Sequence, residues 1–395
     1  MESLSYSKFS QGIQNRLVHQ RIPLSGTIEV TRRCTLKCAH CYNNLPVADD
    51  EAREAELTYD DHRRILDEIV ASGCLWLLYT GGEIFVRPDF LDIYTYAKKK
   101  GLLITLFTNG TLITPKIADY LAEWRPFSVE ITLYGRTEET YEHVTGVKGS
   151  QECCMRGIRL LKELGIPLKL KTMAISSNQH ELWDMKRFVE EELGLEFRFD
   201  AMINPRIDAS QTPLYMRLTP EEVVALDIRD PKRMVEWGRF CTQFNGLPPP
   251  PGHTDDLYQC GGGITSFAVD PYGAMSMCVL SHKDVYDLRS GSFQEGWKYF
   301  LADVRQKKSS RQTKCISCGL KAMCGMCPAN GELENQDPEE PIDFMCQVAH
   351  LRAKALGLSI KPHGECEYCA GASHQDRSSA VSIQPSVGQR EWRLK

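Results

Sequence analysis

Three closely spaced cysteines near the start of the chain are the strongest chemical signal in the sequence. Cys34, Cys38 and Cys41 follow C-x3-C-x2-C spacing, which places three thiolates on one tight loop. A structural zinc site takes four protein ligands, whereas three thiolates suit an iron–sulfur cubane with one iron left free. A catalytic metal needs such an open position. The spacing therefore predicts a catalytic iron–sulfur centre in which all three cysteines are ligands.

A second group of cysteines could hold further clusters. The chain has 16 cysteines in 395 residues, and no apolar export signal is evident at its amino end. Clustered cysteines in such a chain indicate metal sites rather than disulfides. Seven thiolates are too many for one site but suffice for a four-ligand and a three-ligand cluster. The seven are Cys260, Cys278, Cys315, Cys318, Cys324, Cys327 and Cys346.

Two alternatives remain open for the later cysteines. A zinc ribbon on Cys315/Cys318 and Cys324/Cys327 would have a spacer of only five residues, which is short for a four-cysteine zinc site. Cys366 and Cys369 form either a ligand pair or a redox-sensitive pair in the tail.

Alternating β-rich and helical runs predict the element that carries the first cysteine loop. Residues 26–200 contain six β-then-α repeats, which indicate a parallel sheet with helices outside it, an open (β/α)6 barrel resembling a partial TIM barrel. The strands are nearly continuous apolar runs, as expected when both faces of a sheet are covered. The expected strands are 27–31, 75–80, 102–107, 128–133, 168–173 and 197–199, and the expected helices are 58–72, 88–100, 115–124, 150–164 and 182–192.

The rest of the chain is less regular. Residues 1–25 are expected to form an amino-terminal extension and 201–259 an irregular linker with a stiff proline run. Residues 260–370 are expected to form a small, irregular cysteine-rich domain that metal clusters hold together. Within it, a turn at Gly273 predicts a hairpin between 267–269 and 274–279. The composition of 371–395 predicts a disordered tail.

Composition excludes some partners. The formal net charge is −5 and there is no long basic run, so no nucleic-acid partner is expected. No segment of about 18 apolar residues is present, so no membrane span is expected. The polar amino end indicates a cytoplasmic protein.

Further motifs fall where the predicted strands end. The first cysteine loop follows the first strand, Gly81-Gly82-Glu83 follows the second, and Asn109 follows the third. Thr132 ends the fourth. The carboxyl ends of parallel strands meet at one edge, where α/β proteins build their active sites. Asn109 is either a turn residue or a ligand contact.

These motifs resemble those of the radical S-adenosylmethionine (AdoMet) superfamily, in cysteine spacing, in Tyr42 after the third cysteine and in the Gly-Gly-Glu turn. The resemblance implies a [4Fe-4S] cluster whose open iron binds AdoMet. It implies that one electron cleaves AdoMet to a 5′-deoxyadenosyl radical, which abstracts a substrate hydrogen. The residues it places at AdoMet are Gly81, Gly82, Glu83, Asn109, Thr132 near the ribose, and His40, which either packs or lies near the adenine.

The later cysteines resemble a SPASM domain, the auxiliary-cluster extension of these enzymes. That resemblance implies an outer cluster on Cys315, Cys318, Cys324 and Cys346, and an inner one on Cys260, Cys278 and Cys327. The spacing from Cys324 to Cys327 is one residue shorter than usual. The inner cluster lacks an obvious fourth ligand. Cys241, Cys366 or Cys369 supplies it, or the site is open to substrate, or it holds a [2Fe-2S] cluster.

SPASM-bearing enzymes mostly modify peptides, so the resemblance implies a maturase for a ribosomally made peptide or peptide-derived cofactor. The expected outcome is a crosslink, a decarboxylation or an epimerisation. Expected partners are a precursor peptide, a flavodoxin- or ferredoxin-type reductant and a separate leader-recognition protein, because 1–25 offers no room for a leader-binding domain. The alternatives are a tetrapyrrole- or haem-modifying enzyme, a sulfatase-type formylglycine maturase and a non-catalytic iron–sulfur or zinc protein.

The sequence gives no firm acid or base. Glu130, Arg198 and Asp200 lie near strand ends and are interpreted as ion pairs or AdoMet contacts. Lys169 and Lys171 alternate along the fifth strand and face either the barrel interior or solvent. The stretch 141–146 has no assigned role.

Overall fold

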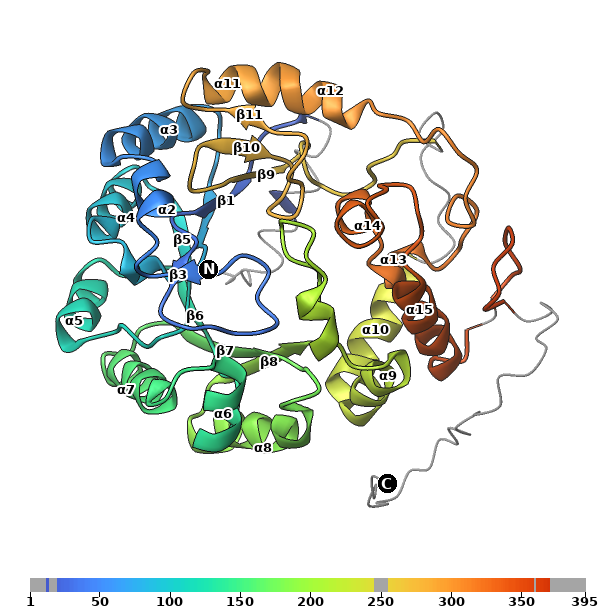
Figure 1. Cartoon of the computed structure of the whole chain (residues 1–395), viewed down its shortest axis with the longest axis horizontal. Helices are drawn as coiled ribbons and strands as arrows, with labels where there is room; N and C mark the ends of the chain where they lie inside the picture. Colours follow the sequence, from blue (N-terminus) through green and yellow to red (C-terminus); the bar gives the residue numbers. More distant parts are fainter. Residues whose placement is uncertain (1–11, 14–19, 245–254, 359, 370–395) are drawn as a thin grey trace, which may run out of the picture. The chain divides into compact units, whose positions relative to one another are not determined.

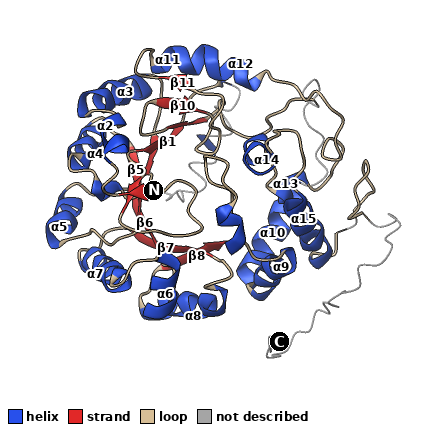
Figure 2. Cartoon of the chain, viewed as in Figure 1, coloured by secondary structure: helices blue, strands red, loops and turns tan. Residues whose placement is uncertain are grey.

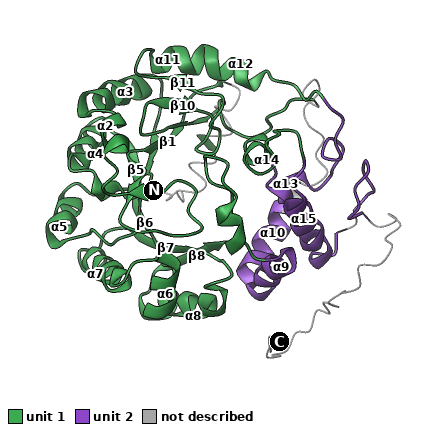
Figure 3. Ribbon diagram, viewed as in Figure 1, with its two compact units in different colours: residues 1–218, 255–310, 327–340 green, residues 219–254, 311–326, 341–395 purple. Residues whose placement is uncertain are grey.

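The computed structural model describes residues 12–13, 20–244, 255–358 and 360–369. The expected tail at 371–395, the proline run at 248–251 and most of the amino-terminal extension lie outside them. The chain forms two compact units (Figure 3). Unit 1 comprises 1–218, 255–310 and 327–340, and unit 2 comprises 219–254, 311–326 and 341–395. The domain boundaries drawn from the sequence stay a prediction.

Unit 1 is built on one nine-stranded sheet in the order β11-β10-β9-β1-β4-β5-β6-β7-β8 (Figure 1). All neighbours from β9 to β8 are parallel, and β10 and β11 are antiparallel. The strands are β1 (Ser25–Glu29), β4 (Trp76–Thr80), β5 (Leu103–Thr108), β6 (Ser128–Thr132), β7 (Leu168–Met173), β8 (Glu196–Asp200), β9 (Ser266–Val269), β10 (Ala274–Ser276) and β11 (Tyr286–Asp287).

The strands curve into an open arc with the helices on its outer side (Figure 2). This confirms the predicted partial barrel and its six parallel strands, β1 and β4 to β8. The helices of unit 1 are α2 (Asp50–Ala55), α3 (Tyr59–Ala71), α4 (Phe90–Lys99), α5 (Pro115–Glu123), α6 (Glu138–Thr145), α7 (Ser150–Glu163), α8 (Leu182–Arg187), α11 (Phe293–Glu295), α12 (Leu301–Arg305) and α14 (Pro328–Asn335), with short helical turns η2 (Ile84–Val86), η3 (Gln179–Glu181), η4 (Phe188–Glu192), η5 (Thr212–Met216) and η6 (Gly296–Phe300).

Local signals explain where these helices begin and end. Thr58 caps α3 and forms a capping box with Asp61, which satisfies two backbone N–H groups at the helix start. Gly101 and Gly165 follow α4 and α7 with positive φ, as the sequence predicts. Two short helices within the predicted barrel, α2 and α6, were not predicted, and neither were α11, α12 and α14 after it. The expected helix 182–192 is divided into α8 and the π-helical turn η4.

The two faces of the sheet differ, and the expectation of strands covered equally on both faces is wrong. Leu106, Ile131 and Leu170 are fully buried beneath the helices. The alternate side chains, such as Glu130 and Lys171, are half-buried on the inner face. An open barrel leaves its inner face free of helices, so polar side chains are tolerated there.

The β9–β10 hairpin extends the barrel sheet. The hairpin itself was predicted, but its parallel pairing with β1 was not. Gly26 in β1 makes this possible, because a Cβ at that position would lie 2.4 Å from the Phe267 ring. Phe267 packs against Phe293 with ring centroids 4.7 Å apart, so the ring anchors the hairpin in the core.

Unit 2 is helical, which corrects the expectation that 201–259 is irregular. It contains α9 (Pro220–Arg229), α10 (Pro231–Phe244), α13 (Lys321–Cys324) and α15 (Asp343–Ala355). Thr219 and Glu222 form a capping box at α9, a signal present in the sequence. No helix among the described residues is long and apolar enough to cross a membrane.

A buried ion pair joins the helices of unit 2. Asp227 in α9 is 1% exposed and accepts hydrogen bonds from Arg352 in α15 at 2.8 and 2.9 Å. Arg233 pairs with the same carboxylate at 2.7 Å. The Arg352 guanidinium also lies over Trp237 and donates to the Met323 carbonyl. One carboxylate therefore organises α9, α10, α13 and α15.

Asp227→Asn keeps the side-chain volume but leaves two arginines without their counter-charge. We expect the variant to lose about 3 kcal/mol of unfolding free energy, because a broken buried pair leaves an uncompensated charge. Urea denaturation of the full chain measures this. The control is Asp184→Asn, whose pair with Arg187 is exposed and is expected to change stability by less than about 0.5 kcal/mol. Equal effects of the two variants would contradict the role given to Asp227.

Candidate active site

The first cysteine loop lies at the carboxyl end of β1. Its start, β2 (Arg33–Cys34), pairs with β3 (Leu45–Pro46). Burial raises the pKa of the Cys34 thiol to about 12, and it also raises the pKa of the Cys38 thiol. The charge of Cys41 raises the pKa of both thiols further. The three thiols therefore face one space, and none is in a disulfide. Three thiolates so close need a cation, so this donor set fits an iron–sulfur cluster.

The Gly81-Gly82 turn is pressed against this loop. The backbone N–H of Gly82 donates to the Thr31 carbonyl at 2.7 Å. The backbone N–H of Glu83 donates to the Arg33 carbonyl at 2.9 Å. A Cβ on Gly81 would lie 2.1 Å from the Thr31 oxygen, and one on Gly82 2.3 Å from the Arg33 oxygen. Gly81 also has φ +134°, which side chains disfavour. Only glycine allows this approach.

Glu83 ties the ends of β4 and β5 together. Its fully buried carboxylate accepts from the Thr108 hydroxyl and the Asn109 backbone N–H, both at 2.7 Å. Burial raises its pKa to about 7, and these hydrogen bonds oppose that rise. Both carboxylate oxygens thus have partners within the protein, so in this structure Glu83 positions the neighbouring turns.

Asn109 connects β5 to the cysteine loop. Its side-chain amide donates to the Thr35 hydroxyl at 3.2 Å and to the Cys34 sulfur at 3.6 Å. The residue with positive φ in this turn is Gly110, not Asn109. The turn interpretation of Asn109 is therefore incomplete, because its side chain reaches a predicted cluster ligand.

Aromatic rings form a wall beside the loop. The His40 ring lies 5.4 Å from that of Tyr134, which in turn lies 5.7 Å from Tyr141. Burial lowers the pKa of His40 to about 4, and its Nδ1 has no hydrogen-bond partner among the described residues. The Thr145 carbonyl accepts from the Lys37 N–H at 2.8 Å. The unassigned stretch 141–146 thus packs against the cysteine loop.

Two residues that hold the loop were missed by the sequence analysis. Arg206 donates to the Cys41 carbonyl at 3.2 Å and to the Asn44 side chain at 2.8 Å. Glu29 is 2% exposed and accepts from Tyr42 and Asn43. A carboxylate in an otherwise apolar strand was a usable signal for Glu29, whereas nothing in the spacing pointed to Arg206.

Comparison with known proteins decides the family. The Radical SAM superfamily model matches residues 28–189. The AdoMet-dependent heme synthase of Nitratidesulfovibrio vulgaris is 32% identical over 350 residues, which cover 80% of this chain and 90% of that protein. This chain belongs to the radical SAM superfamily.

Two further likenesses concern peptide-modifying proteins. The subtilosin biosynthesis protein AlbA of Bacillus subtilis is 25% identical over 331 residues, covering 80% of this chain and 69% of that protein. SuiB of Streptococcus suis has been solved bound to S-adenosylmethionine; it shares 16% identity at a TM-score of 0.62, covering 88% of this chain and 84% of that one. SuiB has also been solved bound to its precursor peptide SuiA. At this identity the likeness to SuiB shows the fold alone.

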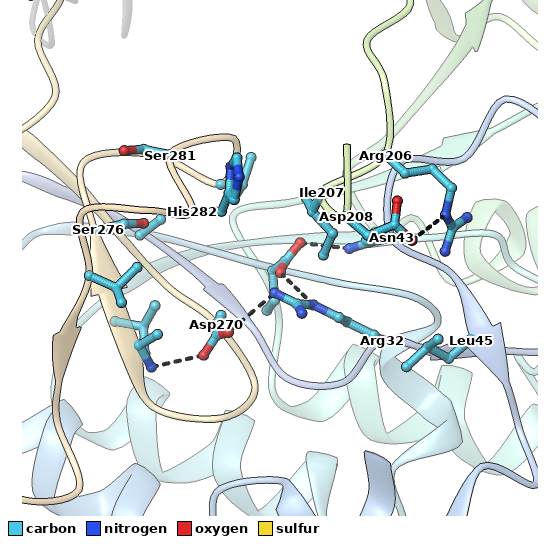
Figure 4. A pocket seen from close by; sticks show the side chains of 16 residues that line it. Arg32, Asn43, Leu45, Arg206, Ile207, Asp208, Asp270, Ser276, Ser281 and His282 are labelled. Carbon is cyan, nitrogen blue, oxygen red and sulfur yellow. Dashed lines mark hydrogen bonds and ion pairs between the residues drawn. The ribbon is translucent and has the colours of Figure 1, made fainter. Parts of the chain in front are cut away.

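This radical SAM enzyme has a cavity of about 360 Å³ beside the cysteine loop (Figure 4). One wall comes from Asn43, two residues after Cys41, and from Arg206. The opposite wall comes from the β9–β10 hairpin and from Ser276 and Val279, which flank Cys278. The cavity is thus lined by residues close in sequence to Cys41 and to Cys278.

The charges that line the cavity are paired with one another. Arg32 lies 3.2 Å from Asp270 and 3.7 Å from Glu29. Arg206 lies 3.5 Å from Asp208, besides its bonds to the cysteine loop. Both arginines of the cavity therefore have an acidic partner, and Arg32 Nε is a buried donor without a hydrogen bond among the described residues.

The inner face of the radical SAM barrel carries a lysine with an altered pKa. Lys171 in β7 lies 3.3 Å from Glu130 in β6 and above the Phe107 ring. Burial lowers its pKa to about 8, and Glu130 opposes that shift. Lys171 thus faces the barrel interior, as one of the two sequence interpretations held. Thr132 is opposite Lys171 in register, and its place near the ribose stays a prediction.

The other candidates on these strands have structural partners. Lys169 pairs with Glu196 at 2.9 Å, and Arg198 pairs with the same carboxylate at the surface. The Asp200 carboxylate accepts from the backbone N–H groups of Ala201 and Met202. Arg198 therefore lies in an exposed ion pair rather than the expected buried one, Asp200 caps two backbone N–H groups, and a contact of either residue with AdoMet stays a prediction.

The later cysteines form the SPASM-like array, divided between the two units. In unit 1, burial raises the pKa of Cys327 to about 11, and the charges of Cys278 and Cys260 contribute, so these three thiols face one another. In unit 2, burial raises the pKa of Cys318 to about 11, and the charges of neighbouring thiols contribute to this rise. The thiols of each predicted group thus interact electrostatically, and each group is a donor set that would suit an iron–sulfur cluster, but the division into two clusters stays a prediction. The group in unit 2 is Cys315, Cys318, Cys324 and Cys346.

Gly82→Ala tests the close approach of the two loops. The added methyl group would overlap the Arg33 carbonyl, so the cysteine loop must shift. We expect AdoMet cleavage to fall at least about tenfold, because overpacking costs about 1–3 kcal/mol and 1.4 kcal/mol is a factor of ten. Release of 5′-deoxyadenosine by anaerobically reconstituted protein measures it. Gly238→Ala, where a Cβ meets nothing within 4 Å, is the control. Similar activity in both variants would refute the argument.

The pKa of Lys171 gives a second test. Because its pKa lies near 8, about half of this side chain is neutral at pH 8, where an ordinary lysine is charged. Reductive ¹³C-methylation followed by NMR titration should show one resonance with a midpoint near pH 8, absent in Lys171→Arg. Glu130→Gln should move the midpoint to lower pH, because the negative charge that stabilises the protonated lysine is lost. A midpoint above pH 10 would show that Lys171 is solvated.

Proposed function

We propose that this radical SAM enzyme is a peptide maturase. It abstracts hydrogen from an unactivated carbon of a precursor peptide and thereby forms a crosslink, decarboxylates a residue or inverts a stereocentre. The supporting observation is the cavity lined by Asn43 of the cysteine loop and by residues of the β9–β10 hairpin and the segment that follows it. Similarity to AlbA supports the same substrate class.

The radical site is proposed to hold a [4Fe-4S] cluster on Cys34, Cys38 and Cys41. With AdoMet bound and one electron supplied by a flavodoxin- or ferredoxin-type protein, this group provides the 5′-deoxyadenosyl radical. The protein's own residues position and shield it. Arg206 fixes the carbonyl of Cys41, and the Asn109 amide donates toward the Cys34 sulfur.

The remaining proposed contacts to AdoMet are the other residues that the family resemblance places there. The Gly81-Gly82 turn offers backbone atoms that no side chain covers. Thr132 and the unpartnered His40 Nδ1 complete the proposed set. Glu83 acts through Thr108 and Asn109, because its carboxylate oxygens already have partners.

Two auxiliary clusters are part of the proposal. Cys315, Cys318, Cys324 and Cys346 supply four thiolates, enough for a complete cluster. Cys260, Cys278 and Cys327 supply three, so the inner cluster takes a fourth ligand from another cysteine such as Cys241, keeps an open position or is a [2Fe-2S] cluster. Exposed thiols and oxygen-sensitive clusters persist in a reducing compartment, which supports a cytoplasmic location.

A second candidate function is modification of a tetrapyrrole. It is favoured by the 32% identity to a heme synthase over 90% of that protein. A porphyrin with several carboxylates calls for cations that are free to pair with them. The two arginines of the cavity, Arg32 and Arg206, already have partners, which favours the peptide.

Turnover with both substrate classes discriminates between the candidates. Anaerobically reconstituted protein is mixed with AdoMet, a reductant and either the precursor peptide encoded beside its gene or iron coproporphyrin. We expect 5′-deoxyadenosine and a mass or deuterium change in the peptide only. The Cys34→Ala/Cys38→Ala/Cys41→Ala variant should release no 5′-deoxyadenosine. Change in the porphyrin alone would establish the second candidate, and no cleavage by wild-type protein would exclude both.

A further inference from the structure

Four buried side chains in unit 2 form a cluster that the SPASM-like array does not include. His350 lies in α15, and His363, Cys366 and Cys369 follow in the segment after it. Each is 4–7% exposed, and their four ligand atoms all lie within 4.8 Å of one another. Two thiols and two imidazoles gathered in this way constitute a complete donor set for one metal ion.

The distances between these atoms match a single tetrahedral ion. His350 Nε2 lies 3.5 Å from the Cys366 sulfur and 3.7 Å from the Cys369 sulfur. His363 Nδ1 lies 3.2 Å from the Cys369 sulfur. Around zinc, with Zn–S and Zn–N bonds of about 2.3 and 2.0 Å, a sulfur and a nitrogen ligand are about 3.5 Å apart.

Surrounding contacts orient the ligands. His350 Nδ1 lies 2.8 Å from the Cys346 carbonyl, so a proton on Nδ1 is donated there and the Nε2 lone pair points to the thiols. Such a second hydrogen bond is typical of metal-binding histidines. The Cys369 N–H donates to the Cys366 carbonyl at 3.3 Å, which closes the Cys-x2-Cys turn. His363 Nδ1 also lies 3.1 Å from the Lys361 carbonyl, a contact that metal binding replaces.

The loop that carries both cysteines is fixed from two sides. Tyr368, between them, contacts Asp343 and Gln347 on α15, the latter at 3.0 Å. Glu367 pairs with Lys314 at 2.9 Å, beside the predicted cluster ligand Cys315. The site is therefore held in place by residues other than its ligands.

We propose that His350, His363, Cys366 and Cys369 bind one structural zinc ion that fastens the segment 360–369 to α15. An iron–sulfur cluster fits less well, because in the His2Cys2 type the histidines and cysteines bind different irons and are farther apart. Cys346 and His350 lie one helical turn apart, so α15 serves a predicted iron–sulfur cluster and the zinc ion together. The proposal does not depend on the reaction of the enzyme.

Metal analysis of the full chain tests the site. Protein is purified and reconstituted anaerobically, passed through a chelator, and its zinc and iron are measured. We expect one zinc per chain, and zinc-edge absorption showing two sulfur and two nitrogen ligands. Cys366→Ser/Cys369→Ser should lose the zinc and keep the wild-type iron content. The matched control is Cys74→Ser/Cys153→Ser, two cysteines outside every cluster, which should keep both metals.

Three results would overturn the proposal: wild-type protein without zinc, zinc retained by Cys366→Ser/Cys369→Ser, or loss of iron in place of zinc in that variant. The last would make these cysteines iron ligands. Should the double serine variant fail to fold, His363→Cys keeps four donors. It is expected to bind zinc with three sulfur ligands and one nitrogen ligand, and an unchanged absorption spectrum would contradict a ligand role for His363.

Discussion

The contact between the Gly81-Gly82 turn and the backbone of the cysteine loop is the constraint on which the radical site depends. The cysteine loop contains little secondary structure of its own, so its shape comes from what packs against it. Two backbone hydrogen bonds join it to the end of β4, and no Cβ fits between the two segments. Arg206 and Glu29 then hold its far end. A loop fixed in this way can present three thiolates to one cluster without rearrangement.

Buried ionisable groups occur in both units, and they fall into two kinds. Carboxylates such as Asp227 and Glu83 have several donors each, so their burial is compensated by the protein itself. Groups of thiols have fewer donors, such as the Asn109 amide at the Cys34 sulfur, and burial raises their pKa. The first kind of group organises helices and turns. The second kind is a donor set that is completed by metal, and it is distributed over both units.

The open barrel explains how the radical site and the proposed peptide-binding cavity can share one unit. Its outer face is sealed by helices, while its inner face keeps polar side chains such as Lys171 and Glu130. The β9–β10 hairpin extends the same sheet and carries its own end toward the cavity beside the cysteine loop. A substrate in that cavity would be bounded by residues adjacent to Cys41 and to Cys278.

The sequence by itself determined the barrel strands, most of their helices and the family, because periodicity, glycine caps and cysteine spacing are local patterns. Its assignment of the auxiliary cysteines to two clusters stays a prediction. Only the tertiary structure showed that β9 joins β1, that Arg206 holds the cysteine loop and that Asn109 reaches Cys34. It alone brought His350 and His363 to Cys366 and Cys369. Except for the short spacing from His363 to Cys369, these contacts join residues that are distant in sequence, and no local pattern specifies which of them fold together.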